Sequence, residues 1–444
     1  MTIRAMPSAR NIESPYAWTR LVVSLLLMTI GGSGMYSVTV VLPQIQAEFD
    51  VSRADASLPY TLTMIGFGLG GILMGRLSDR FGVMIPIVVG TLGLSAGFIL
   101  AGLAGNLWQF ILIQGLLLGL LGTAATFAPL VADTSQWFLR HRGIAIAICM
   151  SGNYVAGAVW PPIMQHFIDS VGWRQTYIGI GVFCLVSMLP LALVYRKRPR
   201  SIVGPAAGDP AAAGTPADTN TQAPARLQPV PRFVSEISRS NPNHPLGMTP
   251  GALQALLCVA GVACCVAMAM PQVHIVAYCG DLGFGAARGA EMLALMLGLG
   301  IISRLVSGWL SDHIGGLRTL LLGSVLQGIA LLMFLSSNGL VSLYVISGLF
   351  GLFQGGIVPA YALIVREFFT PKEAGARVGT VLMATLFGMA LGGWMSGAIF
   401  DMAGSYQAAF INGTIWNVLN ISIVGFLLYR ARGGKWQSPN AAAA

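Results

Sequence analysis

Residues 300–312 read GIISRLVSGWLSD, and this stretch decides the fold. It begins inside an apolar run long enough to cross a bilayer, and it carries one arginine, Arg304, within that run. The stretch continues as GWLSDHIG at 308–315, and the first half of the chain contains the related sequence GRLSDRFG at 75–82. One short segment therefore shows both an internal duplication and a charge in a place where charges are costly.

The composition indicates a membrane protein. Of the 444 residues, 55% are hydrophobic and only 9% are charged, whereas a soluble domain carries about 25% charged residues. The formal net charge of +9 does not indicate a nucleic-acid partner, because the basic residues lie at the ends of apolar runs and in one linker. The six cysteines have no metal-ligand spacing. No metal or cofactor is predicted.

Twelve apolar segments of about 19 to 27 residues are long enough to cross the hydrocarbon core as helices. A helix satisfies its own backbone hydrogen bonds, which lipid cannot do. We therefore predict an all-α membrane protein with twelve transmembrane helices in two six-helix halves. The first six spans are predicted at 18–42, 58–77, 83–103, 107–131, 143–167 and 177–195. The second six are predicted at 251–276, 290–310, 317–335, 340–365, 378–399 and 408–429.

These spans divide the chain into five parts. A polar segment, 1–17, precedes an N-terminal six-helix bundle at 18–195, and a C-terminal six-helix bundle at 250–430 precedes a tail at 431–444. Between the bundles, residues 196–249 open with a basic run and continue with Ala, Pro, Gly and Thr in no periodic order. Such a composition cannot bury a core, so we expect a flexible linker.

The distribution of Lys and Arg predicts the orientation of the chain in the membrane. If both termini and the linker are cytoplasmic, only Arg53, Arg174 and Arg288 of the 25 Lys and Arg residues lie outside. An even number of spans is consistent with this bias. We therefore expect a multi-pass protein of the plasma (inner) membrane with both termini in the cytoplasm.

The two halves repeat one another at three places in the same order. The pairs are LPQI at 42–45 with MPQV at 270–273, LSD at 77–79 with LSD at 310–312, and DSVGWRQ at 169–175 with DMAGSYQ at 401–407. Two halves related as a parallel repeat bind substrate at their interface, near the middle of the membrane.

With these features the chain resembles the major facilitator superfamily. The stretch at 75–82 matches the loop signature of that family, Gly-x-Leu-x-Asp-Arg-x-Gly, and a second copy occurs in the other half. Val83 and Met84 stand where the family usually has two basic residues. The resemblance implies the twelve-helix major facilitator fold and a transport function.

A narrower resemblance is to the monocarboxylate transporter family, with the bacterial oxalate/formate antiporters close by. The sequence WFLRHRGIAIAICMSG at 137–152 is similar to the fifth-span motif of that family, and ESPYAW at 13–18 partly matches the motif before its first span. The family also carries an arginine in span 8, which falls on Arg304. The resemblance implies secondary transport of a small organic anion, most simply a monocarboxylate, by alternating access around Arg304.

Departures from the family pattern bear on coupling. Proton-coupled members have an acidic residue four positions before the span 8 arginine, where this chain has Gly300, and a lysine in span 1, where it has Tyr36. The oxalate-type antiporters have a second basic residue in span 11, and the predicted span 378–399 has none. A single buried charge favours a monoanion over a dicarboxylate. Proton symport and carboxylate exchange both remain open.

The depth of Arg304 supports an anion-binding role on physical grounds. Arg304 precedes Asp312, expected at the membrane edge, by eight residues, or roughly 12 Å along a helix. No Asp or Glu lies deep in any span. A guanidinium without a fixed counter-ion suits a carboxylate that arrives and leaves. The alternative is a snorkelling arginine, or one that pairs with Glu291, Asp312 or a carbonyl.

Other polar residues at useful depth are candidates for the same site. Each can donate to a carboxylate or a hydroxyl, and each can equally form an interhelical hydrogen bond; they are Tyr36, Gln114, Asn153, Tyr154, Gln354 and Tyr361. His274 follows the Pro271 position in span 7 and is a candidate for gating or proton transfer. Asp79 and Asp312 of the duplicated loop are further gating candidates.

Two other functional classes are weighed against the transporter. A drug–proton exporter of the same fold would show a Gly-Pro motif in span 5, and the stretch GNYVAG at 152–157 lacks the proline. An enzyme would need clustered His, Asp, Cys or Ser in the spans, and a sensor would need a folded cytoplasmic domain. We expect neither, so no catalytic residue is predicted. The expected partners are the lipid bilayer, a small carboxylate and a candidate coupling proton, and monomer is the default state.

Overall fold

The computed structural model describes residues 13–138, 141–196, 245–336 and 339–433. The predicted N-terminal segment (1–17), linker (196–249) and tail (431–444) lie mostly outside the described residues. Within those ranges, twelve helical spans are long and apolar enough to cross a membrane, and no strand occurs. The predicted fold class is confirmed.

The N-terminal half forms six spans from helices that mostly extend beyond their predicted apolar cores. They are α1 (Pro15–Gly31) with α2 (Ser33–Phe49), α3 (Arg53–Phe81), α4 (Met84–Gly102), α5 (Leu107–Ile113) with the π-helix η2 (Gln114–Thr123) and α6 (Ala128–Trp137), α7 (Arg142–Val171), and α8 (Trp173–Ala192) with the 3₁₀ turn η3 (Leu193–Arg196).

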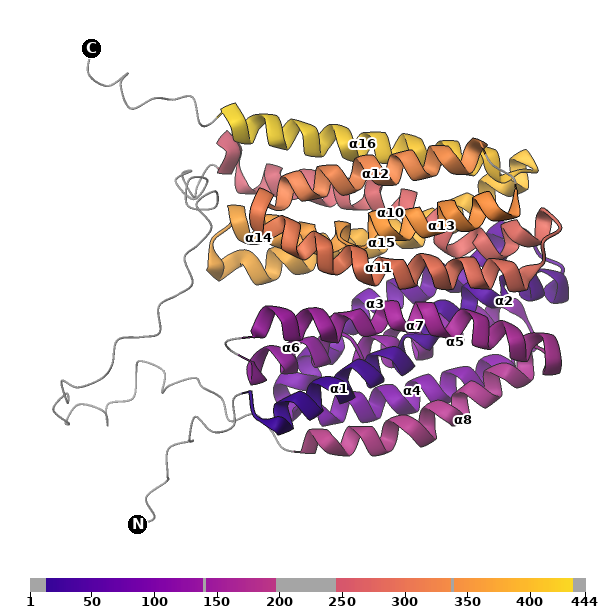
Figure 1. The fold of residues 1–444 in the computed structure, drawn as a ribbon. Coiled ribbons are helices and arrows are strands. Elements are labelled where there is room, and N and C mark those ends of the chain that lie inside the picture. Colours follow the sequence, from indigo (N-terminus) through magenta and orange to yellow (C-terminus); the bar gives the residue numbers. More distant parts are fainter. Residues whose placement is uncertain (1–12, 139–140, 197–244, 337–338, 434–444) are drawn as a thin grey trace, which may run out of the picture.

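The C-terminal half forms the other six spans and lies beside the first half (Figure 1). After the short turn η5 (Pro245–Gly247) come α10 (Pro250–Asp281), α11 (Ala286–Ile314), α12 (Gly316–Ser336), α13 (Leu340–Gln354) with α14 (Ile357–Phe368), α15 (Pro371–Ala403) and α16 (Tyr406–Gly433). We call the side on which α1 begins and α16 ends the terminal side, and the opposite side the far side.

Breaks in the helices distinguish the structure from the uninterrupted spans that we expected. Spans 1, 4 and 10 are each divided, and the divisions lie where small residues pack closely. A Cβ added to Gly31 would lie 2.2 Å from the hydroxyl of Thr126, at the break in span 4. A Cβ on Gly355 would lie 2.3 Å from the carbonyl of Gly300 on α11. The breaks at Gly31 and at Gly355 thus pack against neighbouring helices.

The seam between the halves is tight on the far side where α3 meets α15. A Cβ on Gly397 would lie 2.8 Å from the carbonyl oxygen of Arg53, and one on Gly68, nearer the middle, would lie 2.7 Å from the sulfur of Met383. Two turns further along the same face of α3, a Cβ on Gly75 would meet nothing within 4 Å. The two helices therefore diverge towards the terminal side.

The second seam, between α7 and α11, diverges in the same direction. A Cβ on Gly157 would lie 2.2 Å from Leu297, and one on Gly300 would lie 2.4 Å from the ring of Tyr154. Two turns further along α11, a Cβ on Gly308 would meet nothing within 4 Å. Both seams thus close on the far side and open on the terminal side.

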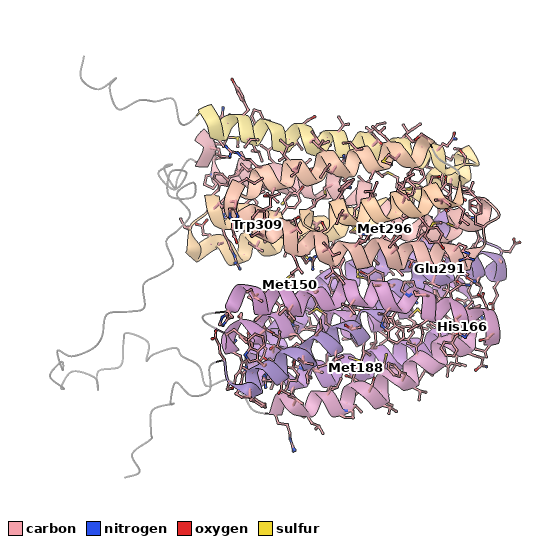
Figure 2. All side chains as sticks on the ribbon, viewed as in Figure 1. Met150, His166, Met188, Glu291, Met296 and Trp309 are labelled. Atoms are coloured by element: carbon pink, nitrogen blue, oxygen red, sulfur yellow. The ribbon has the colours of Figure 1, made fainter. Side chains whose placement is uncertain are left out.

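Figure 2 shows the same arrangement through its labelled side chains. Met150 and Trp309 lie towards the terminal side of their respective halves. Glu291 and His166 lie towards the far side. The structure is therefore that of a two-bundle protein with its interface exposed on the side that carries the termini.

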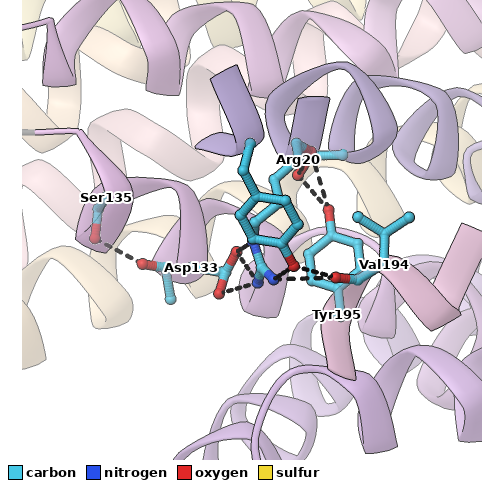
Figure 3. A network of polar contacts seen from close by, with 8 residues as sticks. Arg20, Asp133, Ser135, Val194 and Tyr195 are labelled. Atoms are coloured by element: carbon cyan, nitrogen blue, oxygen red, sulfur yellow. Dashed lines mark hydrogen bonds and ion pairs between the residues drawn. The ribbon is translucent and has the colours of Figure 1, made fainter. Parts of the chain in front are cut away.

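A buried ion pair fixes the terminal end of the N-terminal half (Figure 3). Arg20 of α1 donates to Asp133 of α6 with its Nη2 at 2.7 Å and its Nε at 3.2 Å. The two side chains are only 3% and 1% exposed. The same guanidinium donates to the carbonyl of Val194 in η3 and to the hydroxyl of Tyr16. This network ties three segments of one half together and does not cross the seam.

Loss of the Asp133 charge should strongly destabilise the protein. We expect Asp133→Asn to cost about 3–5 kcal/mol, because the buried Arg20 charge loses its counter-ion. Thermal unfolding in detergent would show it. The matched control is Glu373→Gln, which breaks the i,i+4 pair with Arg377 where Glu373 is 55% exposed; such pairs contribute about 0.5 kcal/mol or less. Equal melting temperatures for the two variants would contradict this account.

Close helix packing inside the N-terminal half gives a second stability test. A Cβ on Gly70 of α3 would lie 2.1 Å from the carbonyl of Leu120 in η2, whereas one on the adjacent Gly71 would meet nothing within 4 Å. Gly70→Ala should therefore destabilise by about 1–3 kcal/mol. Gly71→Ala should be neutral or stabilising by up to about 1 kcal/mol, since alanine favours the helix. The melting temperature of Gly70→Ala should fall, whereas that of Gly71→Ala should stay at wild type or rise; a Gly70→Ala curve at or above wild type would overturn the packing argument.

Candidate functional site

Arg304 lies at the seam between the two halves. It belongs to α11, ten residues before the helix ends at Ile314, which corresponds to a depth of roughly 15 Å. Its side chain is half-buried. Its Nε donates to the carbonyl of Gly355, at the break between α13 and α14, over 3.4 Å, and its Nη1 donates to the carbonyl of Met150 on α7 over 3.3 Å. Met150 belongs to the other half, so the guanidinium bridges the seam.

Arg304 differs from the other buried arginines in its partners. Arg20 pairs with Asp133, and Arg53 pairs with Asp281 at 2.6 Å. Among the residues that the structure describes, Arg304 forms no ion pair and its Nη2 makes no hydrogen bond, while its two existing bonds are long. A guanidinium has five N–H donors in a planar fork. Most of its donor capacity is therefore unused.

The residues that we considered as alternative partners are engaged elsewhere or lie at the helix end. Glu291 accepts from Arg288 one turn earlier at 3.1 Å, and also from the hydroxyl of Tyr344. Asp312 is exposed on the terminal side. Of those alternatives, the structure shows the carbonyl contacts: the hydrogen-bond partners of Arg304 within the described ranges are two main-chain carbonyls. Carbonyls do not neutralise its positive charge.

Two tyrosines interact with Arg304, and a third interacts with one of those two. The ring of Tyr154 covers the guanidinium with its centroid 4.3 Å from Cζ, a distance at which a cation and an aromatic face attract. Tyr36 interacts electrostatically with both Tyr154 and Arg304, and Tyr60 interacts with Tyr36. We call Arg304, Tyr36, Tyr60 and Tyr154 the Arg304 cluster. None of its three hydroxyls has a hydrogen-bond partner in the described part of the chain.

Glycines leave room for two of the tyrosine rings in the Arg304 cluster. The ring of Tyr154 lies against Gly300, where an added Cβ would be 2.4 Å away, and the ring of Tyr36 lies against Gly157, where it would be 2.8 Å away. Tyr36, Tyr60 and Tyr154 are 5%, 2% and 8% exposed. Two of the aromatic rings therefore occupy space that only a residue without a side chain can leave open.

The remaining polar candidates divide into one near Arg304 and others inside the halves. Gln354 immediately precedes Gly355; its Oε1 accepts from Gln272 at 3.0 Å, and its buried Nε2 has no partner in the described residues. Gln114 donates to Tyr177 at 3.2 Å, within the N-terminal half.

Tyr361 and Asn153 also make contacts within their own halves. Tyr361 donates to Asn420 at 3.0 Å inside the C-terminal half. The half-buried Asn153 makes a weak contact with the sulfur of Met35, at 3.9 Å. Of the predicted ligands, Tyr36 and Tyr154 interact with Arg304, and Gln354 adjoins the residue whose carbonyl Arg304 contacts.

The gating candidates occupy the two ends of the seam. Towards the far side, both ring nitrogens of the buried His274 are engaged, Nε2 with the carbonyl of Gly393 at 2.8 Å and Nδ1 with the hydroxyl of Tyr406 at 3.0 Å. Asp79 and Asp312 are exposed near the ends of α3 and α11 on the terminal side. They lie on opposite halves, where the seam is open.

Sequence reasoning missed Tyr60 and Gln272. Tyr60 lies on α3, and its ring approaches Gly393 of α15, where an added Cβ would be 2.9 Å from it. Gln272 belongs to the repeated stretch at 270–273, so its position next to a proline in both halves was a signal that the repeat itself offered. No sequence signal distinguished Tyr60 from other tyrosines, because its role depends on a contact between the halves.

Comparisons with known proteins agree with the fold. The sequence profile of the Major Facilitator Superfamily matches residues 23–340 and 255–443. Monocarboxylate transporter 13 of Bos taurus is 26% identical over 370 residues, which are 82% of this chain and 78% of that protein. Monocarboxylate transporter 11 of Mus musculus is 24% identical over 90% of this chain and 84% of that protein.

A fungal relative and a solved structure extend the comparison. The MFS-type transporter opdF of Penicillium oxalicum is 25% identical over 77% of this chain and 74% of that protein. The crystal structure of a bacterial homologue of the human lysosomal transporter Spinster, inward-facing and unoccupied, superposes with a TM-score of 0.64 at 16% identity, covering 94% of this chain and 96% of that one. The chain is thus similar to the monocarboxylate transporters and belongs to the major facilitator superfamily of membrane transporters.

Proposed function

We propose that this transporter carries a small organic anion, most simply a monocarboxylate, by alternating access around Arg304. The observation that supports this most is that, within the described residues, the charge of the Arg304 guanidinium is not paired with a carboxylate, whereas Arg20 and Arg53 each have a carboxylate partner. The similarity to proteins named monocarboxylate transporters supports the same substrate class.

The chemistry of the Arg304 cluster suits one carboxylate. A guanidinium binds a carboxylate through two parallel N–H···O bonds in its own plane. The Tyr154 ring covers one face of that plane, so an anion approaches from the edge, where Nη2 is unoccupied. The hydroxyls of Tyr36 and Tyr154 and the Nε2 of Gln354 supply further donors for an oxygen atom. With one positive charge in the cluster, a monoanion is the matched ligand.

The two seams support the alternating-access part of the proposal. A major facilitator transporter rocks its two halves around a central site, and the halves here meet on the far side and separate on the terminal side. We propose that the terminal side is cytoplasmic, in the plasma (inner) membrane, from the bias of Lys and Arg. In that orientation the structure is an inward-open state. We assign Asp79 and Asp312 to gating on the terminal side, where they would engage the opposite half when it closes.

The surroundings of Gly300 bear on the coupling mechanism. The Tyr154 ring fills the space beside this glycine, so the acidic side chain that proton-coupled relatives are expected to carry there does not fit. This favours exchange of one carboxylate for another as the alternative to proton symport. His274 is the remaining candidate for a proton step, and its two nitrogens are already bonded.

The test is uptake of radiolabelled lactate, pyruvate and formate into proteoliposomes by wild type, Arg304→Lys and Arg304→Ala. We expect both variants to lose uptake by roughly two orders of magnitude, since removing one partner of a buried charge pair costs about 2–5 kcal/mol. Lysine should fail because an ammonium cannot form the planar two-bond contact. Arg288→Ala, on the far side in an exposed pair within one helix, is the matched control and should transport normally.

The outcome also decides the mode of coupling. Uptake driven by an imposed pH gradient identifies proton symport, whereas uptake that needs an internal carboxylate identifies exchange. Arg304→Ala with wild-type uptake would leave the arginine a structural residue and would remove the carboxylate assignment.

A further inference from the structure

Arg53 joins the two halves on the far side through a dense set of contacts. It begins α3 in the N-terminal half and is only 8% exposed. Its Nη1 and Nη2 donate to the carboxylate of Asp281, at the end of α10, over 2.6 and 3.2 Å. Its Nη1 also donates to the hydroxyl of Tyr406 on α16 at 2.9 Å. Both partners belong to the C-terminal half.

A second carboxylate of the C-terminal half holds the main chain at the same place. Asp401 of α15 accepts from the backbone N–H of Arg53 at 2.9 Å and from that of Ala54 at 2.8 Å. It therefore caps the N-terminus of α3, where the helix dipole favours a negative charge. Gly397 lets the two backbones approach, since an added Cβ would lie 2.8 Å from the Arg53 carbonyl.

An aromatic ring adds to the contact. The ring of Phe400 on α15 lies 4.3 Å from the Cζ of Arg53, within the range of cation–π attraction. The guanidinium is thus held by a carboxylate, a hydroxyl and a ring from three different helices of the opposite half. We call the set Arg53, Asp281, Asp401, Tyr406 and Phe400 the far-side clasp.

The far-side clasp is connected to the Arg304 cluster by consecutive contacts. The hydroxyl of Tyr406, which accepts from Arg53, lies 3.0 Å from Nδ1 of His274, and Nε2 of His274 lies 2.8 Å from the carbonyl of Gly393. Gly393 packs against the ring of Tyr60, a member of the cluster. In a neutral ring His274 donates from Nε2 and accepts at Nδ1, because a carbonyl can only accept.

We propose that the far-side clasp is the gate that holds the far side shut, and that His274 is the positioning residue that links this gate to the substrate site. A gate must break and re-form whenever the far side opens. By contrast, the more deeply buried Arg20–Asp133 pair lies within one half, so rocking does not separate it. The proposal rests on alternating access between the halves and not on the identity of the anion.

The test is the distance between spin labels in the purified full-length protein without substrate, measured by pulsed electron paramagnetic resonance in lipid nanodiscs. One pair, Ser170→Cys with Val341→Cys, reports the far side, and a second pair, Ile144→Cys with Trp309→Cys, reports the terminal side. All four positions are accessible in the structure. Cys258 is the one native cysteine that is not fully buried and is replaced by serine.

In this background, Arg53→Gln should raise the population with a long far-side distance roughly tenfold, because hydrogen bonds to charged groups are lost. The terminal-side distance should shorten in the same population, since rocking moves both ends together. Asp281→Asn should reproduce the shift, and the double variant should add little to either single change. A merely loosened protein would broaden both distances and shorten neither.

The matched control is an arginine–carboxylate pair that lies on the same side of the protein but does not join the halves. Arg174→Gln breaks the Arg174–Glu48 pair, which is 2.6 Å long and lies on the far side but within one half, so its distances should match wild type.

His274→Phe removes both ring hydrogen bonds and should produce a smaller shift in the same direction as Arg53→Gln. Wild-type distances in Arg53→Gln and Asp281→Asn would overturn the gate, and wild-type distances in His274→Phe alone would overturn the link. Neither result depends on whether Arg304 variants lose uptake.

Discussion

The positive charge of Arg304, placed between two helical bundles with no fixed counter-ion among the described residues, is the constraint on which the rest of the structure depends. An arginine within a membrane is costly and requires protein or water around it. Two main-chain carbonyls, from Gly355 and Met150, meet only part of its hydrogen-bonding capacity. The glycines of α7 and α11 then bring Tyr36 and Tyr154 against it. The break at Gly355 and the small residues Gly157 and Gly300 thus lie around this one guanidinium.

The contacts within each half differ from the contacts between the halves. This difference distinguishes the rigid bundles from the interface along which they can move. Within each half the contacts are buried and local, such as the Arg20–Asp133 pair and the bond from Tyr361 to Asn420. Across the seam they concentrate on the far side, around Arg53, and become sparse towards the terminal side. Two rigid bundles that touch at one end can rock until they touch at the other end instead. This rocking is how a major facilitator transporter works.

Sequence alone predicted the twelve helices because the length of an apolar run is set by the thickness of the bilayer. It also placed Arg304 at the interface, since the duplication identifies the axis between the halves. It did not predict the breaks in spans 1, 4 and 10, which depend on contacts with neighbouring helices such as that of Gly355 with α11. For the same reason it could not separate Tyr36, beside Arg304, from Gln114, which bonds to Tyr177 inside one half. The position of a residue in the sequence gives its depth along a helix, but it does not identify the side chain or carbonyl that the residue contacts.

The main-chain anchoring of Arg304 has a consequence for how the transporter can diversify. The Met150 bond is made by a carbonyl, so the side chain at position 150 can change without moving the guanidinium. In the function proposed above, the charge that attracts the anion and the side chains that shape the space around it are therefore independent. On that proposal, substitutions around Arg304 can change the shape of the accepted cargo while the anchor stays in place.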